Sequence, residues 1–376
     1  MRKLALLLGS LVVVASASAK EVVPAPVVVE EAPVQIVEKE VIVYRDKEEG
    51  FRPNGNVDLQ YRYYGRTEKN NGESPKDWNG ANNYSRLQLS GAVQMTEAQK
   101  LEFRVREFND LDKESPDEDG KGGLQHGAKD TQVRLRYFYN HGNLGDSKVN
   151  LTSRVEHHDK GDNQSLEYQA RFNFAEYMFN NDFIKTTDFT VAPKYAYWWS
   201  DDNSSNYDSQ VGADLYTFHE LPWGFSTEFN VYATQHFYGQ DQYFDGATKK
   251  EDKNFTVDIE AYLYHTLPLY TNGNLSIALN SEGGYDAYNW SKEKQFGHEE
   301  KVNALPEYKG EGVGTENAQY SVYFTSAVQA DYQATPNVKL YAAAGAEYRN
   351  WQITSENSAS NWRWQPTAWA GFKTTF

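Results

Sequence analysis

The amino-acid sequence predicts an all-β protein, a transmembrane antiparallel β-barrel that closes on itself. Three observations predict this fold class. Apolar and polar residues alternate with a period of two in segments spread from residue 54 to the end of the chain, and the connections between these segments are alternately short and long. The last segment alternates up to its final residue, Phe376. Strands tilted across a bilayer are ~10 residues long and alternate in this way.

Residues 1–19 have the three parts of a secretory signal peptide. Arg2 and Lys3 are basic, an apolar stretch runs from Leu4 to Val14, and Ala17-Ser18-Ala19 forms a small-x-small cleavage site. The apolar stretch is shorter than the ~20 residues that span hydrocarbon, so a membrane anchor is the weaker interpretation. We expect the mature chain to be exported.

Residues 20–50 are rich in Val, Pro and Glu and differ in composition from the rest of the chain. Pro24, Pro26 and Pro33 interrupt any continuous helix or central strand. This composition favours an extended periplasmic linker. A short helix over Val34–Arg45 that touches the cell wall or plugs the barrel is the alternative. Residues 51–376 then form the barrel.

The period-two pattern defines 14 candidate strands, and a count of 12 or 16 stays open. In the first of them, Val57, Leu59 and Tyr61 alternate with polar residues. The candidate strands are 56–65, 87–95, 101–106, 131–140, 147–157, 165–175, 187–199, 209–218, 225–238, 254–266, 274–287, 319–333, 338–349 and 362–376.

The connections indicate which end of the barrel faces which compartment. The short ones are 96–99, 141–146, 219–224, 267–273 and 334–337, with 175–186 as a longer exception. The long polar ones are 66–82, 109–130, 200–208, 239–253, 288–318 and 350–361, with 158–164 as a brief exception. Short periplasmic turns and long extracellular loops are typical of outer-membrane barrels. Both termini fall at the short-turn end, so the strand count is even.

Aromatic residues at strand ends separate this prediction from a soluble β-sandwich, which also has short alternating strands. They are Tyr195, Tyr197, Trp198, Trp199, Trp223, Tyr285, Tyr288, Trp290, Trp351 and Trp362. Such residues form girdles at the two membrane interfaces of a barrel. A sandwich has no need of them.

The last strand must pair with the first, 56–65, because a sheet in lipid cannot leave a free edge. Its apolar face carries Phe372 and Phe376. In outer-membrane proteins in general such a terminal strand is the signal for barrel assembly, and we expect these two residues to act so here. Thr374 departs from that pattern, which usually has a bulky apolar residue there.

The bulk composition excludes several function classes. The chain has no cysteine, which removes disulfide frameworks and thiol chemistry. Its formal charge of −16 argues against nucleic acid as a partner. The predicted partners are therefore outer-membrane lipid and small solutes, with the cell outer membrane as the location.

The stretch MRKLALLLGSLVVVASASAKEVVPAP, the motif VIVYRD and the pattern RPNG-x-VD-x-QYR-x-YG resemble the start of the fusobacterial major outer membrane porins of the FomA type. The resemblance is close over roughly the first seventy residues and the last strand, and holds in organisation along the whole chain. It implies a homotrimeric, weakly selective diffusion channel that also acts as an adhesin to other bacterial and host surfaces.

Strand phase places charged residues on the face opposite the apolar one, inside the barrel. The basic ones are Arg62, Arg86, Arg104, Arg106, Arg134, Arg136, Arg154 and Arg171. The acidic ones are Asp214, Glu228, Asp258, Glu260 and Glu282. The two sets lie on opposite halves of the ring, which predicts a transverse field across a pore. The alternative is a generic polar lining, with the arginines paired to Glu102, Glu156 and Glu167.

Motifs for nucleotide or calcium binding are weak. GEGVG at 310–314 lacks the strand–turn–helix context of a nucleotide loop. The acidic runs 116–123 and 201–208 lack the full ligand spacing of a calcium loop. We expect no cofactor and no metal.

A catalytic site is also not indicated. His157 and His158 are adjacent, so they point to opposite faces. His236 and His265 lie on neighbouring strands and are the nearest to a pair of catalytic partners, but no serine signature accompanies them. We expect that the protein is not an enzyme.

The sequence therefore predicts a porin through which ions and small hydrophilic solutes diffuse passively. An adhesin whose barrel mainly displays loops is the alternative. Either 288–318 or 109–130 is long enough to fold inward and narrow the pore.

Overall fold

The computed structural model describes residues 50–65, 67–68, 78–80, 85–108, 131–161, 163–200, 205–301, 312–350 and 362–376. The signal peptide, almost all of the predicted linker and the 109–130 loop lie outside the described residues, so the statements about them remain predictions. In the described part, no helix is long and apolar enough to cross a membrane.

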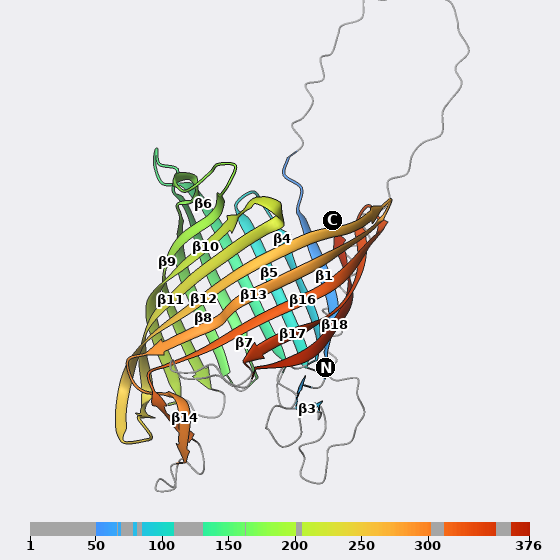
Figure 1. Cartoon of the computed structure of the whole chain (residues 1–376). Helices are drawn as coiled ribbons and strands as arrows, with labels where there is room; N and C mark the ends of the chain where they lie inside the picture. Colours follow the sequence, from blue (N-terminus) through green and yellow to red (C-terminus); the bar gives the residue numbers. More distant parts are fainter. Residues whose placement is uncertain are drawn as a thin grey trace, which may run out of the picture.

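The fold is a closed antiparallel barrel of fourteen strands (Figure 1). In ring order they are β1 (Asn54–Tyr64), β4 (Arg86–Gln94), β5 (Gln99–Phe108), β6 (Gln132–Asn143), β7 (Asn150–Asp159), β8 (Asn163–Asn173), β9 (Lys185–Ser200), β10 (Tyr207–Glu220), β11 (Phe225–Phe244), β12 (Lys249–Asn272), β13 (Leu275–Ser291), β16 (Ala318–Thr335), β17 (Val338–Asn350) and β18 (Trp362–Thr375). Each predicted strand corresponds to one of these, and the counts of 12 and 16 are wrong.

The predicted closure is confirmed. β18 pairs with β1 from Asn56↔Thr375 to Tyr64↔Thr367. The backbone of Phe376 continues the ladder: its N–H donates to Gly55 O at 3.1 Å and its carbonyl accepts from Gly55 N at 2.9 Å. The last residue therefore belongs to the sheet, and it leaves no free edge beside β1.

Three of the predicted long loops, 66–82, 239–253 and 288–318, are wrong in part, because they contain strands. Residues 239–253 largely continue β11 and β12, which pair again from Gln242↔Glu251 to Phe244↔Lys249 after a register shift. The 288–318 connection contains β14 (Phe296–Lys301) and β15 (Gly312–Glu316), which pair with each other. β2 (Thr67–Glu68) and β3 (Trp78–Gly80) form a further small hairpin. Hairpins in water need no apolar alternation, so the pattern does not reveal them.

The two faces of the barrel differ in chemistry as the phase predicts. Large apolar side chains such as Leu87, Leu263 and Phe324 are among the most exposed. Polar side chains such as Gln169 and Gln365 are fully buried. This inverts the pattern of a soluble protein and is the arrangement of an outer-membrane barrel, with lipid on one side and a polar interior on the other.

The inner face is the concave one, because side chains of strands that are not neighbours meet on it. Trp369 of β18 donates to Gln329 of β16 at 3.2 Å, across β17. Gln169 of β8 donates to Asp214 of β10 at 2.7 Å, across β9. Such contacts across an intervening strand need the inside of a curved sheet.

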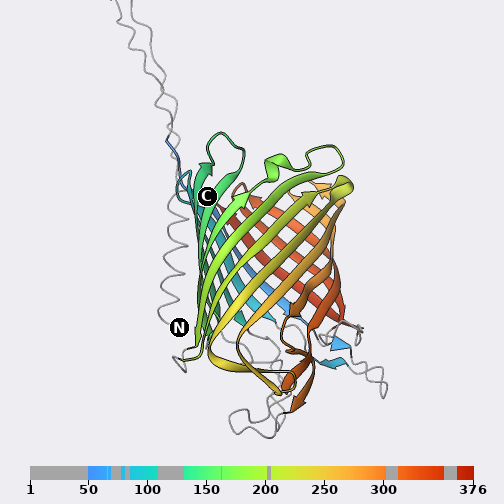
Figure 2. The ribbon, with the colours of Figure 1, turned by 90° about the vertical axis from the view of Figure 1, so that its left-hand side faces the viewer.

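The two ends of the barrel are unlike each other. The turns beside the C-terminus are short, whereas the opposite end carries the longer connections (Figure 1). The β14–β15 hairpin stands beyond that opposite end, beside the tip of the β11–β12 extension (Figure 1 and Figure 2).

Candidate functional site: the charged inner face

Strand register brings predicted charged residues of neighbouring strands to the same face of the sheet. Cross-strand register links them directly: Arg62 lies opposite Arg86, and Arg104 lies opposite Arg134. Arg136 lies opposite both Glu102 and Glu156. On the other half, Asp214 and Asp258 both lie opposite Tyr232, which joins the acidic set to the same face.

Five arginines on β1, β4, β5 and β6 have no ion-pair partner among the described residues. They are Arg62, Arg86, Arg104, Arg106 and Arg134. Arg106 Nε donates to the neutral Gln88 at 2.8 Å, and the Arg62 guanidinium lies 4.6 Å from the Trp369 ring centroid. Like charges directly opposite on neighbouring strands destabilise a sheet. Among the described residues, these strands therefore carry positive charge that no carboxylate pairs with.

Of the other three predicted arginines, Arg136 and Arg154 are compensated by carboxylates, whereas Arg171 has only neutral partners among the described residues. Arg136 and Arg154 both pair with Glu156, and Arg154 also pairs with Glu167. Arg171 donates to Gln169 at 2.8 Å and lies 4.3 Å from the Tyr216 ring centroid. Glu102 pairs with Lys100 at 2.8 Å instead of with an arginine. The pairing expected of a generic lining thus applies to Arg136 and Arg154.

Four of the five predicted acids are held by neutral donors. Glu228 accepts from the Tyr264 hydroxyl at 2.9 Å, and Glu260 from the Tyr232 hydroxyl at 2.8 Å. Asp258 accepts from the Asn289 amide at 2.6 Å. Glu282 accepts from the Tyr323 hydroxyl. Within the part of the chain that the structure describes, none of these four carboxylates has an ion-pair partner.

Asp214 is the exception, and its partner is a residue that the sequence reasoning missed. Lys194 of β9 reaches it at 2.7 Å, and both side chains are buried. Lys194 lies in the run TVAPKYAY, where it is flanked by residues that read as apolar. Counting strand parity from Thr190 and Ala192, which share its face, would have placed it inside.

The uncompensated charges face each other across the barrel. In a ring of fourteen, β5 and β12 are seven positions apart, as are β4 and β11. The strand that carries Arg104 and Arg106 is therefore opposite the strand that carries Asp258 and Glu260. On the remaining wall, from β16 to β18, Arg349 pairs with Glu347 and with Asp286 of β13, and Lys339 pairs with Asp331 at 3.0 Å.

Histidines do not form the catalytic partner set that the sequence left open. His236 lies on the inner face, opposite Asn254, whereas His265 stacks on Phe225 at 4.1 Å on the outer face. The ring of His236 lies between Asp208, at 2.7 Å, and the Thr256 hydroxyl, at 3.0 Å. His157 and His158 point to opposite faces, as predicted: His157 lies opposite the exposed Leu135, and His158 lies opposite Arg134.

Metal binding has no support in the described ranges, because no group of three or more His, Asp or Glu side chains is arranged to hold an ion there.

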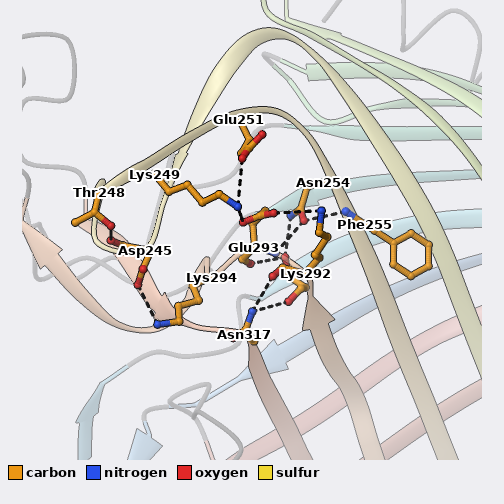
Figure 3. Close-up of polar contacts among 11 residues, drawn as sticks. Asp245, Thr248, Lys249, Glu251, Asn254, Phe255, Lys292, Glu293, Lys294 and Asn317 are labelled. Carbon is orange, nitrogen blue, oxygen red and sulfur yellow. Dashed lines mark hydrogen bonds and ion pairs between the residues drawn. The ribbon is translucent and has the colours of Figure 1, made fainter.

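A group of polar contacts fastens the β14–β15 hairpin to the β11–β12 extension (Figure 3). We call Asn254, Ser291, Glu293 and Asn317 the clasp. Asn254 donates to Ser291 at 2.8 Å and accepts from the Glu293 backbone at 3.1 Å. Asn317 donates to the backbone carbonyls of Ser291, at 3.0 Å, and Lys292, at 2.9 Å.

An ion pair completes this connection on the side of the β11–β12 tip. Lys249 pairs with the buried Glu293 and, at 3.2 Å, with Glu251. The hydrogen bond to Glu293 raises the pKa of Lys249. Lys294 pairs with Asp245 at 3.1 Å (Figure 3). The hairpin is thereby held outside the ring of strands.

Comparison with known proteins identifies no family for this chain and gives only remote similarity to solved structures. No protein-family model matches the chain, and no curated protein matches it. Among solved structures, it is similar to OmpF of Salmonella typhi in complex with daunomycin, with a TM-score of 0.36, 10% identity, and coverage of 86% of this chain and 97% of that chain.

Two further solved structures have comparable scores. The outer membrane channel DcaP of Acinetobacter baumannii has a TM-score of 0.35 and 11% identity, with coverage of 86% of this chain and 96% of that chain. A bacterial polysaccharide outer membrane secretin has a TM-score of 0.35 and 12% identity, with coverage of 86% and 97%. At such scores the fold of this chain rests on its own strand pairing.

Proposed function

We propose that this protein is a porin, an outer-membrane channel through which ions and small hydrophilic solutes diffuse passively. The observation that carries the proposal is charge on opposite inner walls that has no ion-pair partner among the described residues: five arginines on one side, and Glu228, Asp258, Glu260 and Glu282 on the other. A barrel that only anchored loops would gain nothing from like-charged neighbours such as Arg104 and Arg134, which weaken the sheet.

The mechanism follows from those two walls. The closed sheet supports a polar interior, and the opposed charges set up a transverse field within it. Guanidinium groups stay charged at any physiological pH, so the positive wall is permanent. Water and small dipolar solutes orient in such a field, whereas apolar solutes, which would have to displace that oriented water, pass slowly.

Of the two loops that could narrow the pore, 288–318 is the weaker candidate. The clasp and the Lys249–Glu293 ion pair hold its β14–β15 hairpin against the β11–β12 extension. That position is outside the ring, on the side we assign to the cell exterior because it carries the longer connections. The 109–130 loop lies outside the described residues and remains the candidate constriction.

A trimer, which the resemblance to the FomA type implies, is part of the proposal. The outer face of β16, β17 and β18 carries a group of small side chains that suits contact between subunits. There Ala342 lies opposite Ala330 and Ala370, and Ala344 lies opposite Ala368. Small side chains allow close approach between membrane-embedded surfaces, as they do between transmembrane helices.

The test is ion selectivity. Arg104→Glu combined with Arg134→Glu should shift the reversal potential across a salt gradient toward cation selectivity, because it reverses the charge at the centre of the positive wall. Arg104→Lys with Arg134→Lys keeps the charge and is the matched control, with selectivity close to wild type. Reversal potentials that do not differ between the two double variants would contradict the proposal.

Display of loops for adhesion is a second candidate function, and the clasp favours it. A hairpin that stands outside the barrel and is fastened by buried polar groups presents a fixed surface to other cells. The two functions are compatible, because the clasp leaves the inner walls untouched.

A further inference from the structure

A row of aromatic rings lines the inner wall formed by β10, β11, β12 and β16. Phe218 contacts Tyr264 with ring centroids 6.3 Å apart. Tyr264 contacts Tyr262 at 6.0 Å, and Tyr262 contacts Tyr323 at 6.2 Å. These rings come from strands that are not all neighbours, so they form a continuous surface on the concave side. Sequence parity alone does not reveal it, because the contacts cross strands.

A glycine lets the row pass over β13. Gly284 lies opposite Tyr262 on one side and opposite Tyr323 on the other. It has no side chain to stand between the two rings, which therefore meet across it. Its φ is 150°, and a Cβ on this residue would collide with the carbonyl oxygen of Ala261, so no other residue fits there.

At both ends of this wall a cation of the protein lies over a tyrosine ring whose hydroxyl is bound to a carboxylate. The Arg349 guanidinium is 4.6 Å from the Tyr323 centroid, and Tyr323 donates to Glu282. The Arg171 guanidinium is 4.3 Å from the Tyr216 centroid, and Tyr216 donates to Asp214 at 3.0 Å. Ring and carboxylate together attract a cation in each case.

In the middle of the wall, aromatic rings again lie around a carboxylate, but among the described residues no cation of the protein lies over them. Glu228 lies opposite Phe218 on one side and Tyr262 on the other, and it accepts from Tyr264. Its second oxygen accepts from the Asn230 amide at 2.6 Å. Among the described residues, no Lys or Arg pairs with Glu228 or lies over Phe218, Tyr262 or Tyr264. All three rings are half-buried, so part of each remains open to the interior.

We infer that Phe218, Glu228, Tyr262 and Tyr264 form a binding site for alkylammonium groups on solutes that pass through the barrel. Three aromatic rings around one carboxylate suit a cation that is weakly hydrated and has an apolar surface. A small hydrated ion such as K⁺ gains less from the rings, because it keeps its water. The inference rests on the proposed porin function and specifies one class of solute.

Choline is the probe, and 3,3-dimethyl-1-butanol, which has the same shape without the charge, is its control. Calorimetric titration of the refolded protein in detergent micelles should show choline binding at least about tenfold tighter than the neutral alcohol, the factor that ~1.4 kcal/mol of cation–π attraction gives. Tyr264→Leu should weaken choline binding about tenfold, whereas Tyr264→Phe keeps the ring and should retain most of it. Phe218→Leu removes a ring with no hydrogen bond and gives a second test if the tyrosine variant does not fold.

Equal binding of choline and the alcohol, or choline binding unchanged in both ring-removal variants, would overturn the inference. Single-channel recording on the same preparation separates it from the porin proposal. A conducting protein without choline binding contradicts only the site, and choline binding by a folded protein that does not conduct contradicts only the channel.

Discussion

Whether a residue stands at an odd or an even position along its strand decides which face of the sheet its side chain lies on. The sequence shows this alternation clearly. Leu87 and Leu135 are apolar and exposed, while their neighbours Arg86 and Arg134 point inward. One lipid-facing position in a strand therefore fixes its other side chains until a bulge occurs. Which inward residues then pair depends on neighbouring register, and this is why the bond between Lys194 and Asp214 could not be predicted, although parity alone places Lys194 inside.

We expect replacement of Gly284 to lower the stability of the barrel directly. Gly284→Ala puts a Cβ against Ala261 O and forces a non-glycine residue to a positive φ, so we expect a loss of about 1–3 kcal/mol in unfolding free energy. Urea unfolding in phospholipid vesicles, followed by tryptophan fluorescence, measures it. Gly283→Ala is the control, because its nearest contact is 3.1 Å and its φ is not positive. Equal unfolding midpoints for the two variants would show that the backbone at Gly284 is not constrained.

The sequence pattern of a strand depends on whether the strand lies within the membrane or extends into water. Within the membrane, one face of a strand contacts lipid and is apolar, and the other faces the polar interior. β1 and β18 could therefore be predicted from the sequence, together with their pairing. Beyond the membrane, water meets both faces, and the extension of β11 and β12 to Phe244 and Lys249 has no periodic pattern. The clasp was equally hidden, because Asn254 and Ser291 are ordinary polar residues until the fold brings them together.

The β14–β15 hairpin should be removable without effect on the pore. Gln295 N–H already donates to Glu316 O at 3.1 Å, so residues 296–315 can be replaced by a two-glycine turn that leaves this pair and the clasp intact. We expect unchanged single-channel conductance, because the hairpin stands outside the ring. Binding to partner bacteria of cells that carry this variant, measured in parallel, should fall if the hairpin is an adhesive surface.

A rise in conductance after this deletion would show that the hairpin obstructs the pore and that the clasp does not keep it outside the ring. Replacement of the short turn at 144–149 by a similar linker is the control for deletion as such, since that turn lies at the opposite end of the barrel.

For the whole molecule, the net charge of −16 says little about which ions pass. On the porin proposal, the charges that matter are those on the two inner walls. Among the described residues, arginines without an ion-pair partner lie on β1, β4, β5 and β6, and acids without one lie on β11, β12 and β13. The sequence reasoning could predict this segregation because it needs only parity and strand order. The alternative of a generic lining anticipated the pairs of Glu156 and Glu167 with arginines, but not the pair of Asp214 with Lys194, which forms across neighbouring strands.

The measurement that tests the central claim most directly is single-channel conductance of the purified, refolded protein in a planar bilayer. We predict large current steps that are ohmic at low voltage and occur in multiples of three, as expected of an open trimeric channel. Well-folded protein that inserts into the bilayer and gives no conductance would contradict the account, and the barrel would then be a filled scaffold for its loops.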